Sequence, residues 1–370
     1  MRTRFRDGHI LAQNGFERSD IDVDGAIFAA PAGDADRSVD LAGDLLIPGF
    51  IDIQVNGGGG VLFNDDPSVE GIAAIAAAHR RYGSAGILPT LISDALPRIA
   101  VALDAVDAAI AAGVPGILGA HIEGPFISPA RHGIHREDRL SRMDADMVAL
   151  LCRPRRGVVL LTVAPEVVPP ETIARLTSAG VIVSLGHSDA DWETTRHALD
   201  AGARGFTHLY NAMSQLRNRA PGMVGAALED PEAYAGIILD GHHIHPASFR
   251  VALRAKPIDR LVLVTDAMPS VGSDAPSFML QGRSIHREGD VLTSDDGVLA
   301  GSTLDMLSAV RNAMSQGNLT LAEAVAMATT SPAAFLRLPP PAIAVGKPAT
   351  MLRLSPDLKL RSIWIDGREA

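Results

Sequence analysis

Eight short apolar runs recur along the middle of the chain and constrain its fold more than any other feature. The runs are FIDIQV (50–55), GILPTLI (86–92), GILGAHI (116–122), VVLLTVA (158–164), VIVSLG (181–186), RGFTHL (204–209), YAGIILD (234–240) and RLVLVTD (260–266). Most are followed by a polar or glycine-containing segment. Short runs that are apolar on both faces are typical of strands in a parallel sheet covered on both sides.

Helix-like stretches lie between most of these runs. Examples are residues 67–83, 97–113, 170–180, 191–202 and 246–256, several of which begin with Pro or an Asp/Ser cap and end in Gly. Eight strand–helix units favour an α/β fold of the closed (β/α)8 type, the TIM barrel. A doubly wound open sheet is the alternative, but no strand–GxGxxG–helix fingerprint supports it. Two further helical segments, 302–317 and 319–336, follow the eighth run.

The two ends of the chain differ from this middle part. Both carry short alternating segments punctuated by Gly and Asp, and neither is long enough to bury a good core alone. We therefore expect them to pair into one small β-sandwich domain. The predicted division is 1–46 and 341–370 for that domain and 47–340 for the barrel.

Composition excludes several classes of function. The formal net charge of −10 argues against a general nucleic-acid surface, which would usually be basic. No apolar run approaches membrane-spanning length, and the N-terminus lacks the apolar core of a signal peptide, so we expect a cytoplasmic protein with no membrane contact. The single cysteine, Cys152, excludes an internal disulfide framework and lies in a helix-like segment, which disfavours a catalytic role.

Polar residues able to bind a metal or move a proton stand at the C-terminal ends of five of the eight runs. They are Glu123, His187, His208, the pair His242 and His243, and Asp266. Because the C-terminal ends of barrel strands converge on one mouth, we expect these side chains to meet there. One carboxylate with two imidazoles suits zinc or a similar divalent ion, and an unliganded carboxylate such as Asp266 can act as general base and acid.

Other candidates have simpler explanations. A single Glu or His at a strand end is more often a hydrogen-bonded structural group, whereas four such groups together are not expected by chance. His9, His79, His197 and His286 lie on helix faces or in the terminal regions and are assigned structural roles. The run Gly57–Gly60 could cradle a phosphate, but a flexible strand-to-helix connection is the better interpretation.

Motifs along nearly the whole chain carry a resemblance to a known family. They are PGFID-Q-x-NG (48–57), HIEGPF (121–126), LGHSDA (185–190), THLYNAM (207–213), PGMVGA (221–226), DGHHIHP (240–246), VTDAM (264–268) and LAGSTLDM (299–306). In this order the set resembles the amidohydrolase superfamily and, within it, the family of N-acetylglucosamine-6-phosphate deacetylases. The resemblance implies a (β/α)8 barrel with a small β-sandwich built from both chain ends, in agreement with the strand count.

The resemblance also implies roles for individual residues. It makes Glu123, His187 and His208 the ligands of one divalent metal ion per subunit, for which zinc, iron, cobalt and manganese are all acceptable, and it makes Asp266 the acid/base. The implied substrate contacts are Ile134, His135, Asn211, Ala212, His243, Leu299, Ala300 and Gly301. Arg219 resembles an arginine that reaches the substrate phosphate in a neighbouring subunit, which implies a homodimer. His242 stands where the family varies.

Gln54 and Asn56 end the first barrel strand, where two-metal relatives carry His-x-His. Neutral amides are much poorer ligands than imidazoles, so we expect the second metal position to be vacant.

The implied function is hydrolysis of N-acetyl-D-glucosamine 6-phosphate to D-glucosamine 6-phosphate and acetate, in amino-sugar catabolism. A metal-activated water would be the nucleophile and Asp266 the general base and acid. N-acetylgalactosamine 6-phosphate, which differs at one hydroxyl, stays open as the substrate. A catalytically silent binding module is disfavoured because the ligand set is complete. A cyclic-amidase-type hydrolase is disfavoured because the paired His-x-His and bridging lysine are not found.

Overall fold

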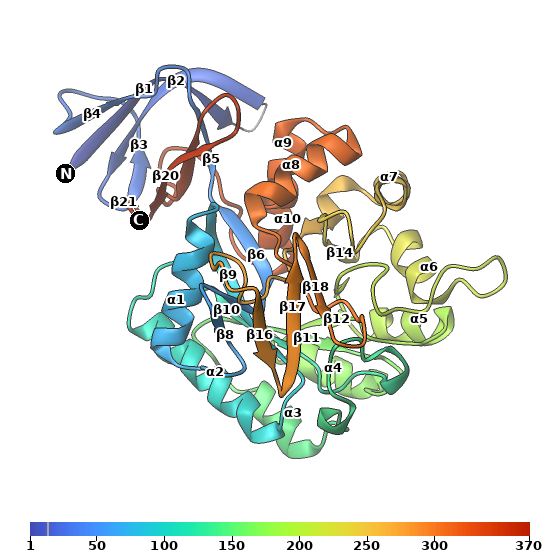
Figure 1. The fold of residues 1–370 in the computed structure, drawn as a ribbon. Coiled ribbons are helices and arrows are strands. Elements are labelled where there is room, and N and C mark those ends of the chain that lie inside the picture. The colour runs from blue at the N-terminus through green and yellow to red at the C-terminus, as the bar shows by residue number, and fades with distance from the viewer. Residues whose placement is uncertain (13–14) are drawn as a thin grey trace.

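A computed structural model describes residues 1–12 and 15–370. In this part of the chain, eight parallel strands form one sheet and are hydrogen-bonded in chain order (Figure 1). They are β6 (Phe50–Val55), β9 (Ser84–Ile92), β10 (Gly119–Glu123), β11 (Val158–Val163), β12 (Ile182–Leu185), β13 (Gly205–Phe206), β14 (Tyr234–Ile237) and β15 (Leu261–Leu263). Each overlaps one of the predicted runs, so the barrel strands predicted from the sequence are confirmed.

The first and last strands close this sheet into a barrel. Just beyond β15, the backbone N–H of Asp266 donates to the carbonyl of Gln54 (3.0 Å), and the N–H of Asn56 donates to the carbonyl of Ala267 (2.9 Å). A hydrogen bond between side chains lies one residue before these backbone bonds, where Thr265 Oγ1 donates to Asp52 Oδ2 at 2.5 Å. The closure excludes the doubly wound open sheet.

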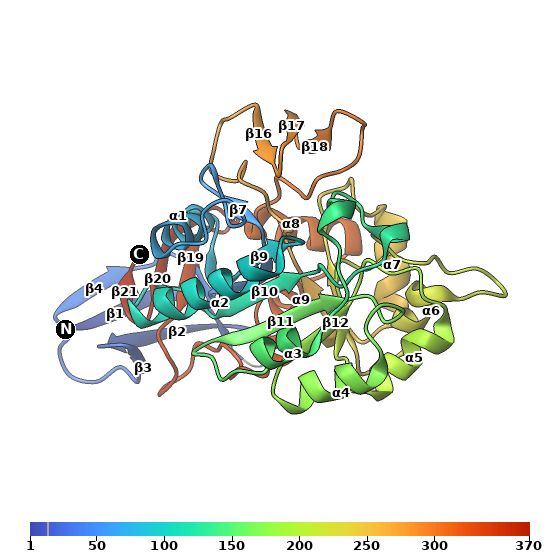
Figure 2. The same ribbon diagram turned by 90° about the horizontal axis from the view of Figure 1, so that it is seen from below.

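Helices cover the outside of the barrel (Figures 1 and 2). They are α1 (Val69–Arg80), α2 (Leu96–Ala111), α3 (Ala145–Leu151), α4 (Pro170–Ser178), α5 (Trp192–Asp200), α6 (Gly222–Glu229), α7 (Pro246–Ala255), α8 (Met306–Gly317), α9 (Leu321–Met327) and α10 (Thr330–Phe335). Several begin at side-chain caps: Ser68, Asp191 and Asp305 accept from backbone N–H groups at the starts of α1, α5 and α8. Ser68 and Asp191 are expected caps, whereas α8 begins four residues later than the predicted segment 302–317. Among the described residues, the helices are too short or too polar for any of them to cross a membrane.

The chain ends join in a separate sheet with its own core. Its strands are β1 (Arg2–Ala12), β2 (Gly15–Asp24), β3 (Ile27–Ala29), β4 (Arg37–Asp40), β5 (Leu45–Pro48), β19 (Met351–Leu354), β20 (Leu360–Ile365) and β21 (Arg368–Glu369). Antiparallel pairing of β5 with β19 unites the two ends, and the rings of Phe5 and Trp364 meet edge to face in the core at 5.1 Å. The predicted pairing of the ends is confirmed, whereas the exact domain boundaries stay a prediction.

A small antiparallel sheet inserted after β15 was not expected from the sequence. It consists of β16 (Ser277–Leu280), β17 (Arg283–Glu288) and β18 (Val291–Ser294) and lies outside the barrel (Figure 2). Its own small core includes Leu280, Ile285 and Leu292. Two-residue turns at Gln281–Gly282 and Gly289–Asp290 connect its strands, and each contains a glycine of the kind that marks a hairpin.

The glycine run forms a tight hairpin between β6 and α1. Its strands are β7 (Gly57–Gly58) and β8 (Val61–Leu62). The N–H groups of Gly57, Gly59 and Gly60 donate to carbonyls of Ala267, Val271 and Pro269. Because these amides already have partners, the run is a connection and does not cradle a phosphate. His79, which is fully buried, contacts the carbonyl of Gly57 (2.9 Å), which agrees with the structural role assigned to it.

We predict a pH-dependent stability difference at Asp52, which is fully buried beneath the barrel closure. Burial raises the pKa of this carboxyl from 3.8 to about 7, although hydrogen bonds from Thr265 act in the opposite direction. Between these values the unfolded chain ionises while the folded chain keeps its proton, so folding loses stability as the pH rises. Relative to Asp52→Asn, the wild type should lose a few kcal/mol between about pH 4 and pH 7, at about 1.4 kcal/mol per unit.

Urea denaturation of both proteins in the same series of buffers measures this difference, because all other titrating groups are shared. A difference that does not change with pH would contradict the burial argument.

Candidate active site

Three predicted metal-binding side chains meet at the mouth of the barrel. Nε2 of His187 lies 3.3 Å from Oε1 of Glu123, and Nε2 of His208 lies 3.1 Å from the same oxygen. The two Nε2 atoms are 3.0 Å apart. All three side chains are buried. The ends of β10, β12 and β13, far apart in the sequence, therefore bring one oxygen and two nitrogens together.

The triangle of ligand atoms fits a divalent cation. Zinc bonds of about 2.0–2.1 Å in a tetrahedral arrangement separate neighbouring ligand atoms by about 3.3 Å. Lone pairs this close repel one another unless a proton or a cation lies between them. Burial opposes ionisation of Glu123, but its interactions with the neighbouring imidazoles of His187 and His208 outweigh burial and hold its pKa well below the usual range. The carboxylate is thus available as an anionic ligand.

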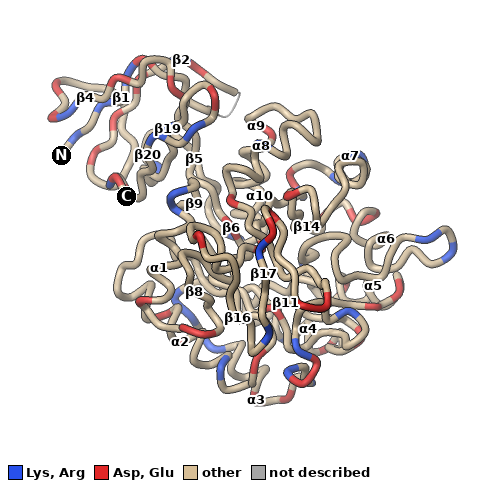
Figure 3. Tube along the Cα trace, viewed as in Figure 1, with Lys and Arg blue, Asp and Glu red and all other residues tan. Residues whose placement is uncertain are grey.

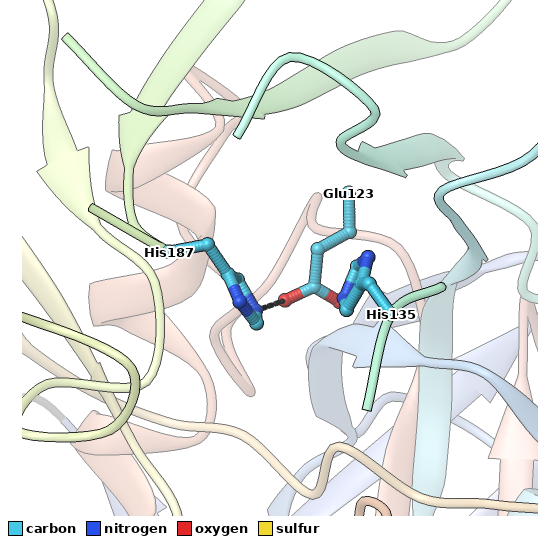
Figure 4. Close-up of side chains that lie close together, drawn as sticks. All are labelled: Glu123, His135 and His187. Atoms are coloured by element: carbon cyan, nitrogen blue, oxygen red, sulfur yellow. Dashed lines mark hydrogen bonds and ion pairs between the residues drawn. The ribbon is translucent and has the colours of Figure 1, made fainter. Parts of the chain in front are cut away.

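His135 also lies in this cluster. Glu123, His135 and His187 each offer an atom within 4.8 Å of the others, and Figure 4 shows the carboxyl of Glu123 between the two imidazoles. Distance alone therefore leaves both His135 and His208 as candidates for the third ligand.

Hydrogen bonds separate the roles of these histidines. Nδ1 of His187 lies 2.9 Å from the carbonyl of Arg131, which can only accept, so Nδ1 carries the proton and Nε2 offers a lone pair. For His135 the pattern is reversed: the backbone N–H of Ser93 donates to Nδ1 (3.3 Å). Burial and the neighbouring His187 lower the pKa of His135 well below its usual range, so it is neutral with the proton on Nε2. His135 therefore presents an N–H group, not a lone pair, to the cluster.

Asp266 lies beside the cluster with a perturbed pKa. Burial, reinforced by the charge of Glu123, raises the pKa of Asp266 to about 6. Its Oδ1 accepts from Asn56 Nδ2 (2.6 Å) and from Gln54 Nε2 (3.2 Å). A carboxyl group with a pKa near neutrality can both accept and return a proton at physiological pH.

The backbone is strained at three of these positions. His187, His208 and Asp266 have φ angles of 48°, 37° and 51°, in the left-handed region that side-chain-bearing residues rarely adopt. Such conformations cost about 1–3 kcal/mol each and persist only where the surroundings enforce them. Around Asp266, bonds to Gln54 on one side and Ser302 on the other supply that enforcement. Strain concentrated at the strand ends supports a functional role.

A cavity of about 380 Å³ opens above the cluster. Besides the groups already described, its lining includes the predicted contacts Ile134, Asn211, Ala212, His243, Leu299 and Gly301, together with Asn56. Three predicted residues do not line it: Ala300 packs in the core of the inserted sheet, Gln54 lies beneath the cavity wall, and Arg219 lies elsewhere. His242 is exposed and is not part of the lining.

The structure adds residues that the sequence analysis missed. Arg131 lines the cavity and is paired with Asp189 at 2.8 Å. Ser93 holds His135, its Oγ lying 2.7 Å from Nδ1. Asp240 holds His243, its Oδ2 lying 2.6 Å from Nδ1. Arg131 lies four residues before His135 in the segment RHGIHRED (131–138), and Asp240 begins the motif DGHHIHP, so sequence proximity to the predicted residues was the available signal for these two.

Arg219 lies on a loop that projects from the barrel before α6 (Figure 1), and basic residues lie at the tip of this loop (Figure 3). It is exposed, and within the described residues it forms no ion pair. Arg219 therefore does not line the cavity of its own chain.

Comparisons with known proteins agree with this geometry. A sequence model described as the amidohydrolase family matches residues 45–370. The chain is 48% identical, over 88% of its length and 83% of the relative, to N-acetylgalactosamine-6-phosphate deacetylase of Shewanella sp. (strain ANA-3). It is 33% identical, over 90% and 88%, to N-acetylglucosamine-6-phosphate deacetylase of Haemophilus influenzae. The crystal structure of N-acetylglucosamine-6-phosphate deacetylase from Pasteurella multocida superposes with a TM-score of 0.96 at 30% identity, covering 100% of both chains.

The two candidate third ligands can be separated by metal analysis. We predict that His208→Asn binds a divalent ion at least about tenfold more weakly than the wild type, because a lone-pair donor is lost. His135→Asn should keep its metal, because His135 presents a proton to the cluster. Equilibrium dialysis followed by elemental analysis measures both. Loss of metal from His135→Asn with retention in His208→Asn would reverse the assignment.

Proposed function

Because the chain belongs to the amidohydrolase family, we propose that it hydrolyses the acetamide of an N-acetylhexosamine 6-phosphate, releasing acetate and the amino sugar 6-phosphate. The observation that carries the proposal is the meeting of Glu123, His187 and His208 with Asp266 at one cavity. This set combines a cation-binding triangle with a carboxyl group poised to move a proton. A catalytically silent binding module would need neither.

The cation site is assigned to Glu123, His187 and His208. A divalent ion there supplies Lewis acidity, which makes water a better nucleophile at neutral pH and polarises the acetyl carbonyl. Zinc fits this donor set, and iron, cobalt and manganese accept the same ligands. One ion per chain is expected, because Gln54 and Asn56 direct amide N–H groups, not lone pairs, toward the neighbouring carboxylates.

The chain's own residues supply the remaining steps. Asp266 accepts the proton of the attacking water and later returns it to the departing nitrogen. His135, with its proton on Nε2, donates to the acetyl oxygen as negative charge develops there. His243, held through Nδ1 by Asp240, keeps its Nε2 free for the sugar or its phosphate.

The first candidate substrate is N-acetyl-D-glucosamine 6-phosphate. The Haemophilus influenzae relative and the Pasteurella multocida structure are both named as deacetylases of this sugar phosphate. N-acetylgalactosamine 6-phosphate is the second candidate. The 48% identity to the Shewanella enzyme named for that sugar is the specific observation in its favour.

Initial rates on both epimers and on the unphosphorylated sugars test the proposal. We expect kcat/KM for at least one phosphorylated epimer to exceed that of its unphosphorylated sugar by about tenfold or more. The reason is that a sugar without a phosphate cannot form the charged hydrogen bonds that the phosphate makes with the protein. The ratio of the two phosphorylated epimers identifies the substrate. If neither phosphorylated sugar is hydrolysed by the metal-loaded protein, the proposed function is wrong.

Asp266→Asn tests the proton transfer. The amide can neither accept nor return the proton, so we expect kcat to fall by about 10²–10⁴-fold. Elemental analysis should still find one metal ion per chain, because Asp266 is not assigned as a ligand. Appreciable turnover by the metallated variant would remove Asp266 from this role.

A homodimer completes the proposal. Arg219 is exposed on a projecting loop and lies outside its own cavity, which supports a contact with the phosphate bound by a second copy. A guanidinium matches the geometry of phosphate oxygens.

Complementation tests this arrangement. Arg219→Ala should raise KM about tenfold or more through loss of the phosphate contact, and Asp266→Asn should be nearly inactive. In mixed dimers formed by co-expression, the Arg219→Ala subunit keeps Asp266 and receives Arg219 from its partner, so one site regains a low KM. Mixed dimers that show only the high KM of the Arg219→Ala parent would place Arg219 in its own site.

A further inference from the structure

The two amides at the end of β6 do more than occupy a position that lacks histidines. Gln54 and Asn56 are 2% and 1% exposed, so their polar groups must find partners inside the protein. Nε2 of Gln54 lies 3.0 Å from Glu123 Oε1 and 3.2 Å from Asp266 Oδ1. Nδ2 of Asn56 lies 2.6 Å from Asp266 Oδ1.

We propose that Gln54 and Asn56 are positioning residues that hold Oδ1 of Asp266 and leave Oδ2 as the oxygen that exchanges the proton. Both side-chain hydrogen bonds that the described residues make to this carboxylate end on Oδ1. An oxygen that accepts two N–H groups is a weaker base than its free partner. The proposal rests on the proposed hydrolysis, in which Asp266 moves the proton, and it names which oxygen does so and what orients it.

Gln54 separates two carboxylates that share a buried site. A primary amide carries two N–H groups, and the contacts of Gln54 direct one to Glu123 and the other to Asp266. Like charges held close together in a buried site raise each other's energy. The amide therefore places positive partial charge between them and ties the proposed metal ligand to the proposed proton carrier.

Asn56 supports the same conclusion, because one of its buried polar atoms has no hydrogen-bond partner among the described residues. This atom is Oδ1. A carboxylate only accepts, so the contact with Asp266 forces the NH2 group toward Asp266 and leaves Oδ1 unpaired. A leucine of similar size would avoid that cost. The contact of Nδ2 with Asp266 is the interaction that explains an asparagine here.

The barrel closure fixes the register of these contacts. The carbonyl of Gln54 accepts from the N–H of Asp266, and the N–H of Asn56 donates to the carbonyl of Ala267. Gln54 and Asn56 are alternate residues, so both side chains leave β6 on the same face. Asp266, whose φ is 51°, is thereby held both by its backbone and by its carboxylate.

Isosteric variants test the proposal. Asn56→Leu removes the donor to Asp266 and keeps the volume. We expect kcat to fall about 10–100-fold, KM to change less than threefold, and one metal ion per chain to remain.

Gln54→Met should lower kcat by a similar factor and should also weaken metal retention, because Gln54 contacts Glu123. Asn312→Leu is the matched control: Asn312, which lies on α8, donates through Nδ2 to the carbonyl of Leu239, so this variant loses an amide contact and should keep kcat.

A double-mutant cycle separates positioning from a general structural defect. If Asn56 acts through Asp266, Asn56→Leu has no further effect on kcat in the Asp266→Asn background. A structural role would lower kcat by the same factor in both backgrounds. Melting temperatures and metal content of all variants accompany the kinetics.

The outcomes are distinct. An active wild type whose Asn56→Leu variant keeps kcat within twofold, or a cycle in which the two effects multiply, overturns this inference and leaves the proposed function in place. A metal-loaded wild type that hydrolyses neither sugar phosphate overturns both.

Discussion

The junction between β6 and the residues after β15 is the constraint on which the rest of the structure depends. Backbone hydrogen bonds of Gln54, Asn56 and Asp266 close the barrel there, and the side chains of the same three residues contact one another at the mouth. The contacts that close the sheet and the contacts that orient the proposed proton carrier therefore depend on the same three residues. A barrel that closed in another register would lose both the closure bonds and the contact between amides and carboxylate.

Beneath this mouth the barrel is polar, which is unusual for a protein core. Hydrogen bonds connect His121, Thr162, Ser184 and Thr207 in a buried layer. Burial lowers the pKa of His121 to about 4, so the layer is uncharged. His121, Ser184 and Thr207 precede Glu123, His187 and His208 by two, three and one positions, and Thr162 lies on the intervening strand β11. The layer therefore restricts how those strand ends can move.

Much of the fold could be predicted because its signals are local. The eight strands and most helices follow from apolar runs and caps such as Ser68 and Asp191, which depend on residues a few positions apart. The inserted sheet was missed because its strands β16 and β18 have only four residues each, and their apolar faces pack on Met268 and Leu62, whose proximity no local pattern reveals. The break between α9 and α10 was missed for a related reason: the apolar pattern continues through Thr329.

The sequence by itself determined the barrel, the pairing of the chain ends and the set of chemical groups at the strand ends, because strand periodicity and topology send those ends to one mouth. Only the tertiary structure decided which atom of each group is available. Ser93, 42 residues before His135, makes that histidine a donor, and Gln54, 212 residues before Asp266, engages one carboxylate oxygen. Protonation sites and orientation depend on such distant partners, and residue type and spacing do not encode them.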